Sequence, residues 1–167
     1  MRSHRYFGIW IGFMLLILMG CSKEPARDEQ TAYDYVKAQG YKIISTEDEA
    51  FEYTLTKKLL YGSPESTPYQ QMWGVQAASP DDYLGKKITI FKFTVSNHPL
   101  EKIYLTDTTN VNILMADGEV IGGTSFPLKE GELLMGSAYS LDGRTLEEVT
   151  GLTFKEWSDD WKKRYDN

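Results

Sequence analysis

The fold of this chain is decided by residues 87–95, KITIFKFTV. The stretch is rich in β-branched and aromatic side chains, which suit a pleated, half-buried surface. It therefore predicts the strongest strand in the chain. The segments on either side of it indicate what kind of sheet this strand joins.

Further strands are predicted both before and after this stretch. In residues 50–56, AFEYTLT, apolar and polar side chains alternate, as on a strand with one buried face. Asp117-Gly118 lies between two apolar segments and indicates a hairpin turn, and Gly122-Gly123 indicates a bulge or a strand end. Strands are expected over 41–45, 50–56, 102–107, 111–115 and 119–124, with one more over 130–141.

Helices are predicted at both ends of the domain and within one loop. Thr31, with an acidic residue three positions on, indicates a helix start, and Gly40 indicates the end of that helix. The acidic turn 47–49 is expected to be exposed. The irregular insert over 57–86 is expected to hold a short helix and a single helical turn, each opened by a proline.

The C-terminal segment carries two capping-box patterns, Thr145 with Glu148 and Thr153 with Glu156. Four aromatic residues then share one helical face, which predicts either a helix docked on the sheet or a surface that stacks on sugars or partners. Docking is favoured, because an unpacked terminal helix would fray. The four residues are Phe154, Trp157, Trp161 and Tyr165.

Together these elements predict an α+β fold, mainly an antiparallel sheet with helices on one face. The order of elements is similar to the outline of PepSY and cystatin-like domains, although no motif of either family is present. The length fits a single domain over residues 31–167 that needs no disulfide to hold it.

The N-terminus has the layout of a secretory signal peptide. The segment 1–5 is short and basic, and residues 6–20 contain no charged side chain. A membrane-spanning helix needs about 17–25 apolar residues, so this run is slightly short for a span. It ends in LILMGC at Cys21, the single cysteine of the chain.

The ending LMGC resembles the lipobox of bacterial membrane lipoproteins, with Leu18, Gly20 and Cys21 in the matching positions. The resemblance implies a diacylglyceryl group on the Cys21 thiol, cleavage between Gly20 and Cys21, and an amine open to further acylation, for example with palmitate. Residues 1–20 are then the signal peptide, and residues 21–30 a polar, lipidated tether. An uncleaved single-span anchor and an ordinary secreted protein are the alternatives.

Two other segments, 117–123 and 139–157, are similar to stretches of uncharacterised lipoproteins of Gram-positive bacteria. The resemblance implies the same location, on the extracytoplasmic face of the cell membrane, and it implies no particular activity. Two or three acyl chains on Cys21 would anchor the domain durably, whereas one chain anchors only marginally.

Charge and cysteine content exclude several classes of function. The chain has 18 basic and 24 acidic residues, and loss of residues 1–20 lowers the net charge from −6 to about −8. This balance disfavours nucleic acids and anionic lipids as partners. After Cys21 no cysteine remains to form a disulfide or a thiolate metal site.

No catalytic, metal or cofactor site is predicted. His98, in the loop SNHPL, lacks a cysteine or serine nucleophile in a recognisable motif, and we expect an exposed loop histidine. Asp81-Asp82 and Asp159-Asp160 have neither the spacing of a calcium loop nor that of a glycosidase pair. They are expected to be helix-start or solvated acids.

The sequence therefore predicts a lipid-anchored extracytoplasmic protein with a non-catalytic domain that binds a protein or a small ligand. One alternative is a cell-envelope enzyme, a hydrolase of wall polymer or peptide, with carboxylates brought together by the fold. Another is a purely accessory role beside a membrane complex.

Overall fold

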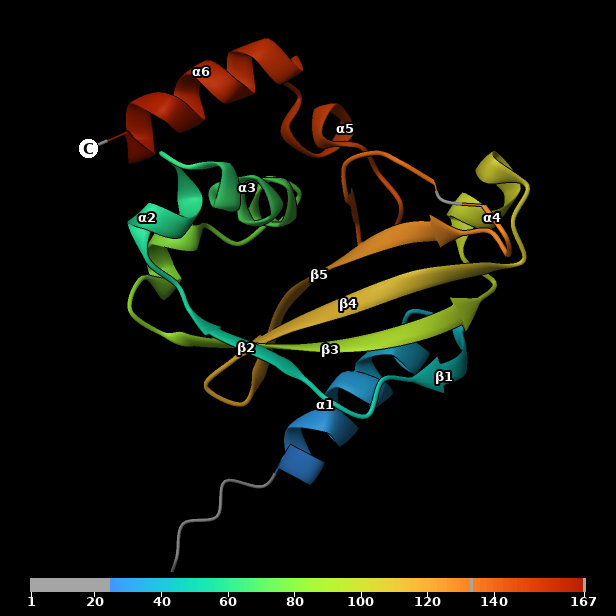
Figure 1. Ribbon diagram of the computed structural model, residues 1–167. Helices are drawn as coiled ribbons and strands as arrows, with labels where there is room; N and C mark the ends of the chain where they lie inside the picture. The colour runs from blue at the N-terminus through green and yellow to red at the C-terminus, as the bar shows by residue number, and fades with distance from the viewer. Residues whose placement is uncertain (1–24, 133, 167) are drawn as a thin grey trace, which may run out of the picture.

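A computed structural model describes residues 25–132 and 134–166 of the chain. Its centre is a six-stranded antiparallel sheet in the order β1-β3-β4-β5-β6, with β2 paired to the other end of β3 (Figure 1). The predicted α+β class with an antiparallel sheet is confirmed. The strands are β1 (Lys42–Thr46), β2 (Phe51–Thr54), β3 (Lys87–Ser96), β4 (Thr108–Ala116), β5 (Glu119–Leu128) and β6 (Tyr139–Ser140).

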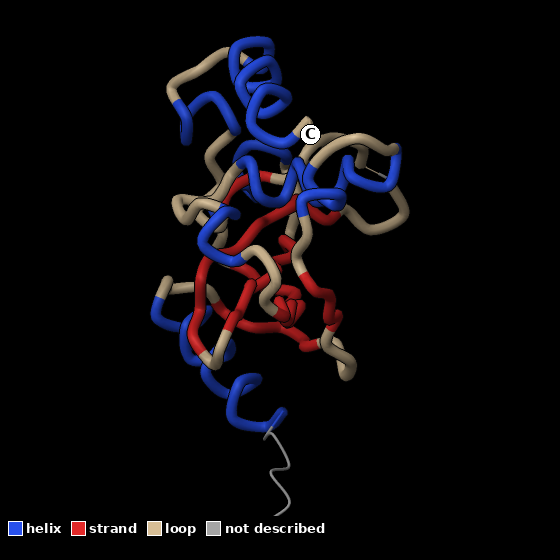
Figure 2. Tube along the Cα trace, turned by 90° about the vertical axis from the view of Figure 1, so that its left-hand side faces the viewer, coloured by secondary structure: helices blue, strands red, loops and turns tan. Residues whose placement is uncertain are grey.

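Helices cover both faces of the sheet, and not one face as the sequence suggested. Helix α1 lies on one face, here called the α1 face, and α2, α3 and α6 lie on the other, here called the α6 face (Figures 1 and 2). The helices are α1 (Pro25–Ala38), α2 (Lys57–Leu60), α3 (Thr67–Gly74), α4 (Pro99–Tyr104), α5 (Leu146–Thr150) and α6 (Phe154–Tyr165), with 3₁₀ turns η1 (Pro64–Ser66) and η2 (Pro80–Tyr83).

The stretch 87–95 explains why both faces are covered. Side chains alternate across a strand, so Ile88 and Ile90 point to the α6 face while Phe91 and Phe93 point to the α1 face. A strand that is apolar on both sides must be buried on both sides. Strand β4 repeats the pattern, because Leu114 joins the first core and neighbouring residues join the second.

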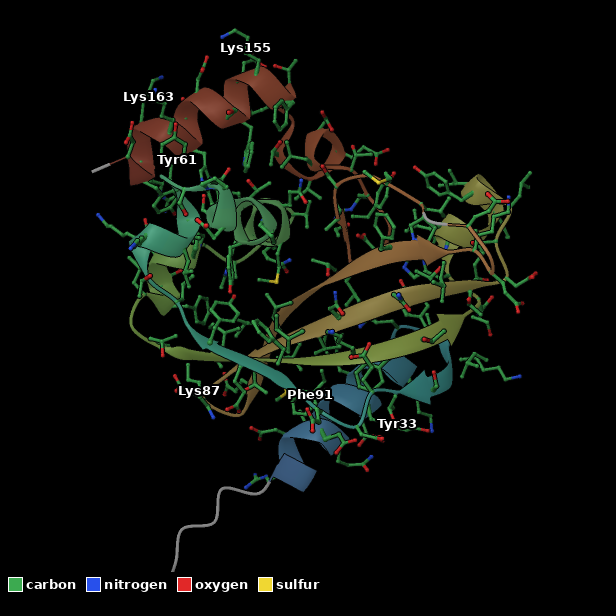
Figure 3. The ribbon with its side chains drawn as sticks, viewed as in Figure 1. Tyr33, Tyr61, Lys87, Phe91, Lys155 and Lys163 are labelled. Atoms are coloured by element: carbon green, nitrogen blue, oxygen red, sulfur yellow. The ribbon has the colours of Figure 1, made fainter. Side chains whose placement is uncertain are left out.

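Two hydrophobic cores result, one on each face. The core of the α6 face contains Leu55, Leu60, Trp73, Ile88, Ile90, Leu114, Ala116, Trp161 and Tyr165. The core of the α1 face contains Ala32, Val36, Phe91, Phe93, Val95, Val111, Ile113 and Met115. The side chains of Phe91 and Tyr33 lie on the α1 side in Figure 3.

The hairpin predicted at Asp117-Gly118 joins β4 to β5. Asp117 and Gly118 have φ angles of 53° and 82°, as a two-residue hairpin turn with positive φ at both positions requires. The predicted bulge is also present. Leu114 pairs with Gly122 and Met115 with Val120, so that Ile121 is the extra residue.

Two predicted strands were wrong. Residues 102–107 do not form a strand, because the chain enters helix α4 at Pro99. A capping box between His98 and Glu101 starts this helix, and Leu105, with φ of 54°, ends it. Only Tyr139 and Ser140 of the stretch 130–141 belong to a named strand.

Helix α1 begins earlier than predicted, at Pro25 and not at Thr31. Residues 25–30, expected in the tether, are therefore helical. Proline suits the first helical turn because its missing N–H is not needed there. The signal peptide 1–20 and residues 21–24 of the tether lie outside the described residues.

Both predicted capping boxes at the C-terminal end are confirmed. Helix α6 packs on the helical layer of α2 and α3 and not directly on the strands. The indole N–H of Trp161 donates to the Leu60 carbonyl over 2.7 Å. Tyr165 is buried and Trp157 half-buried, whereas Phe154 at the start of the stripe is 62% exposed. The last three residues of the stripe are therefore packed, as expected, but against α2 and α3 and not on the sheet as predicted.

Candidate functional site

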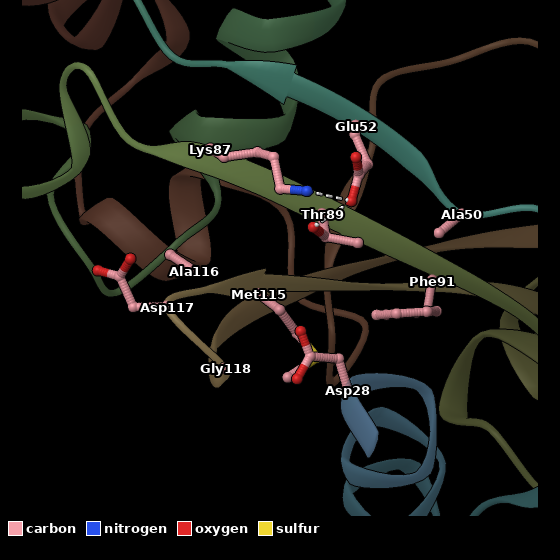
Figure 4. Close-up of a pocket in the computed structure, with 10 residues that line it drawn as sticks. All are labelled: Asp28, Ala50, Glu52, Lys87, Thr89, Phe91, Met115, Ala116, Asp117 and Gly118. Carbon is pink, nitrogen blue, oxygen red and sulfur yellow. Dashed lines mark hydrogen bonds and ion pairs between the residues drawn. The ribbon is translucent and has the colours of Figure 1, made fainter. Parts of the chain in front are cut away.

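A cavity of about 310 Å³ opens on the α1 face, beside the first turn of α1; we call it the α1 pocket (Figure 4). Its walls come from α1, from β2 and β3, and from the β4–β5 hairpin. The residues that line it are Asp28, Ala50, Glu52, Lys87, Thr89, Phe91, Met115, Ala116, Asp117 and Gly118.

The pocket exists because α1 does not cover the whole face. Helix α1 packs on β1, β4 and β5. Lys87, Thr89 and Phe91 follow one another at every second position of β3, and therefore share the α1 face. Strand β2 pairs along this part of β3 and brings Glu52 opposite Thr89. The result is an apolar floor of Phe91 and Met115 surrounded by charged side chains.

The rim of the α1 pocket holds three carboxylates and one ammonium group. Lys87 Nζ lies 2.6 Å from Glu52 Oε1, and the Thr89 hydroxyl donates to the same oxygen over 3.2 Å (Figure 4). Asp117 is paired with the nearby Lys86, with an N–O distance of 3.1 Å. Asp28 is half-buried and makes no ion pair with any described residue.

This arrangement suits binding better than proton transfer. The two lysines balance the charges of Glu52 and Asp117, which leaves the charge of Asp28 at the rim. A ligand with an apolar body and one cationic group would complement such a site. Among the described residues, no group of three or more His, Cys, Asp or Glu side chains could hold a metal ion.

His98 is not the exposed loop histidine that was expected; it is 2% exposed. Its Nδ1 accepts from the backbone N–H of Leu100, and its Nε2 therefore donates to the Leu141 carbonyl over 3.0 Å. Burial lowers the pKa of His98 below its ordinary value. The sequence does not indicate this capping box, because histidine is not among the preferred N-cap residues.

The acidic pairs lie at the surface and do not converge on a site. Asp81 is in the first turn of η2 and forms an ion pair with Arg164 of α6, at 2.8 Å from its Nε. Asp159 and Asp160 pair with lysines on their own helix. The predicted helix-start role is confirmed for Asp81, whereas Asp159 and Asp160 are exposed inside α6 and lie neither at a helix start nor in a turn. The turn 47–49 is exposed, as expected.

The residues of the α1 pocket were not predicted as a site. Asp28 was assigned to the tether, Glu52 to the polar side of a strand, and Asp117 to a turn. No motif joins them, because the pairing of β2 with β3 and the placement of α1 bring them together. The single predicted site residue, Cys21, lies outside the described residues.

Comparison of the chain with models of protein families, with curated proteins and with solved structures found no match. Within residues 25–132 and 134–166, no helix has the length and apolar character to cross a membrane.

Proposed function

We propose that this chain is a lipid-anchored protein of the extracytoplasmic face of the cell membrane, and that its domain binds a small ligand in the α1 pocket without catalysis. One observation carries the proposal. The lipobox-like cysteine, Cys21, precedes Pro25 at the start of α1 by only four residues, and Asp28 in the first turn of that helix lines the pocket.

The chain length then sets how far the pocket is from the anchor. Four peptide steps span at most about 14 Å, and the three further residues to Asp28 add roughly 5 Å along the helix. A pocket this close to the bilayer is within reach of molecules at the membrane surface. Helix α6 lies across the sheet from α1 and would face away from the membrane (Figure 1).

The lining of the α1 pocket indicates the class of ligand. The buried side chains of Phe91 and Met115 form the apolar floor of the pocket, and Asp28 offers a carboxylate without an ion-pair partner among the described residues. The volume is at the low end for small-molecule sites, about 300–1,000 Å³. We therefore propose a small amphiphile with an ammonium group as ligand.

Probes that differ only in charge test this proposal. Phenethylammonium, 2-phenylethanol and 3-phenylpropionate would be titrated into the mature chain in maltoside micelles, with binding followed by protein NMR. Because a partly exposed ion pair is worth up to about 1 kcal/mol, the ammonium probe should bind roughly fivefold more tightly than the alcohol. Asp28→Asn should remove this preference, whereas Asp107→Asn, an exposed carboxylate outside the pocket, should not.

A second variant tests the cavity itself. Ala50 is exposed at the pocket, so Ala50→Trp should fill it and weaken the binding of all three probes while the chain stays folded. Equal affinities for the three probes, or unchanged binding by the Ala50→Trp variant, would contradict the proposed site.

The proposed membrane location is tested separately, by fractionation of cells that express the Cys21→Ser variant. This change removes the acylated thiol, so we expect the protein to leave the membrane fraction or to accumulate unprocessed. Normal processing and membrane attachment of the variant would show that Cys21 is not the anchor.

The three carboxylates around one cavity support a second candidate, a hydrolase of wall polymer or peptide. Such an enzyme needs one carboxyl to act as a proton donor and another to act as base or nucleophile. In the α1 pocket, Glu52 and Asp117 are each already in an ion pair with a lysine. Turnover of a wall polymer by the purified chain, abolished by Asp28→Asn or Glu52→Gln, would establish this candidate instead.

A further inference from the structure

A second cavity lies on the opposite side of the molecule, between α6 and the end of α3; we call it the α3–α6 cleft. Its volume is about 330 Å³. Three tryptophans and two charged residues contribute to its lining, together with small residues and with Gln76, Pro80, Thr150 and Leu152. The lining residues used below are Trp73, Trp157, Trp161, Ala78, Asp160 and Arg164.

Small residues on α3 and after it give the cleft its shape. A Cβ atom on Gly74 would lie 2.7 Å from Cζ2 of Trp157, so the indole packs directly on the α3 backbone. Ala77 and Ala78 follow without bulky side chains. One edge of the Trp157 indole is thereby in contact with α3, while the residue remains only half-buried.

The three indole N–H groups are not equally satisfied. That of Trp73 donates to the Tyr53 hydroxyl over 3.0 Å, and that of Trp161 to the Leu60 carbonyl. Trp157 makes no hydrogen bond through its indole N–H with any described residue. Because buried or half-buried indole N–H groups usually have a partner, this donor is available to a ligand.

The cleft is lined by one acidic and one basic residue, so its lining carries no net charge. Each of the two also has a polar atom that makes no hydrogen bond with a described residue. Asp160 contacts Lys163 through Oδ1 at 3.2 Å, which leaves Oδ2 without a partner in the described part of the chain. Arg164 binds Asp81 and Ser79 through Nε and Nη2, which leaves Nη1 free among the described residues. The cleft thus presents an acceptor, a planar group of donors and an indole N–H beside aromatic surface.

From this combination we infer that the α3–α6 cleft binds the ring of a neutral sugar. A pyranose offers a C–H face that packs on an aromatic ring, and hydroxyls that both donate and accept hydrogen bonds. The absence of net charge at the cleft favours an uncharged ligand over an ion. About 330 Å³ is at the low end for ligand sites and fits one ring or two. The inference does not depend on the α1 pocket or on the lipid anchor.

The indole N–H resonance of Trp157 gives a direct readout. The ¹⁵N-labelled mature chain would be titrated with methyl β-glucopyranoside, N-acetylglucosamine, chitotriose and, as an acyclic polyol, sorbitol. We expect the cyclic sugars to shift the Trp157 resonance in a saturable way at millimolar concentrations, and sorbitol to have no such effect. Tighter binding of chitotriose than of the single rings would indicate a polymer as the natural source, and equal binding a free sugar.

Variants separate the cleft from the helix that carries it. Trp157→Leu, followed through the indole resonances of Trp73 and Trp161 that also line the cleft, should weaken sugar binding roughly tenfold, from the loss of stacking and of the indole donor. Asp160→Ala, on the exposed side of α6, should weaken it about threefold without unfolding the chain. Asp159→Ala is the matched control, because Asp159 does not line the cleft, and it should bind normally. No shift at Trp157 with any cyclic sugar, or an equal loss for the two aspartate variants, would overturn the inference.

Discussion

The two faces of the sheet are covered in different ways. The α6 face carries two layers of helix, with α6 packed on α2 and α3, and its core includes the buried indoles of Trp73 and Trp161. The α1 face carries one helix, which buries small side chains such as Ala32 and Val36. The α1 pocket opens beside the first turn of that single helix.

This difference shows how one domain can be both stable and open. Burial of large aromatic side chains contributes most of the hydrophobic stabilisation per residue. A single helix of small buried residues contributes less, and leaves part of the sheet available to a ligand. In Figure 3 Lys155 and Lys163 lie on the outer surface of α6, and Lys87 lies at the open part of the α1 face.

The largest expected effect tests this contrast in stability. Trp161→Ala removes a buried indole, and should lower the free energy of unfolding by about 3–5 kcal/mol. Tyr33→Ala on α1 removes a half-buried ring and should cost clearly less. Urea unfolding of both variants measures the difference, and equal losses would mean that the two faces contribute alike.

The next effect concerns the link between the helical layer and the sheet. The Gln76 side chain donates to the Gly123 carbonyl over 3.1 Å and accepts from the Gly123 N–H over 2.9 Å. Gln76→Leu leaves these backbone groups of the buried Gly123 unpaired, which should cost about 1–3 kcal/mol. Gln76→Glu keeps an acceptor for the N–H but sets a carboxylate oxygen against the carbonyls of Met72 and Gly123, so it should also lower stability in the same urea assay. A loss below about 0.5 kcal/mol for Gln76→Leu would contradict this role.

Helix starts sharpen the comparison further. Thr153 caps α6, so Thr153→Ala should lower stability by about 1 kcal/mol. Thr31, which the sequence marked as the cap of α1, lies inside that helix and bonds back to the Arg27 carbonyl. Thr31→Ala should therefore be neutral or slightly stabilising in thermal unfolding. A loss of about 1 kcal/mol at Thr31 would place the start of α1 there after all.

The smallest expected effect is a pH dependence of the free energy of unfolding, caused by the buried His98. His98 Nε2 and the Tyr41 hydroxyl share the Leu141 carbonyl, and Tyr41 packs on the core of that face. Because burial lowers the pKa of His98 in the folded chain, the unfolded chain binds a proton more readily. Stability should therefore fall as the pH decreases from the ordinary histidine pKa, about 6.5, towards the lower folded value.

The variant His98→Asn checks this assignment. Asparagine is a good N-cap and does not titrate. The stability of the variant should therefore no longer change with pH in the range above that in which carboxylates titrate. Urea midpoints at about pH 7.5 and about pH 5.5 suffice for the comparison. Identical pH profiles of the two chains would show that another group is responsible.

Local signals predicted the parts of the fold that depend on nearby residues. The strand 87–95, the hairpin at Asp117-Gly118 and the two capping boxes of the C-terminal helices are specified by short patterns, and all are present. The strand predicted over 102–107 was wrong because a residue that is rarely an N-cap, His98, starts helix α4 there. The alternation of apolar and polar side chains along the strands also did not show that helices would cover both faces of the sheet.

The candidate site depends on long-range placement, and was therefore not visible in the sequence. Asp28, Glu52 and Asp117 come from three elements that meet only in the folded chain. Likewise, the aromatic stripe on α6 indicated buried side chains, but not that the indole N–H of Trp157 would have no partner among residues 25–132 and 134–166. Sequence patterns find such residues one by one and do not show which of them lie together.

The most direct test of the proposed function is mass spectrometry of the N-terminal peptide of the chain, isolated from the membrane fraction of its own cells. The proposal predicts a peptide that begins at Cys21 and carries acyl chains on its sulfur, which would place the α1 pocket next to the bilayer. A peptide that begins at Met1, or a Cys21 with a free thiol, would contradict the lipid anchor and the placement of the pocket derived from it.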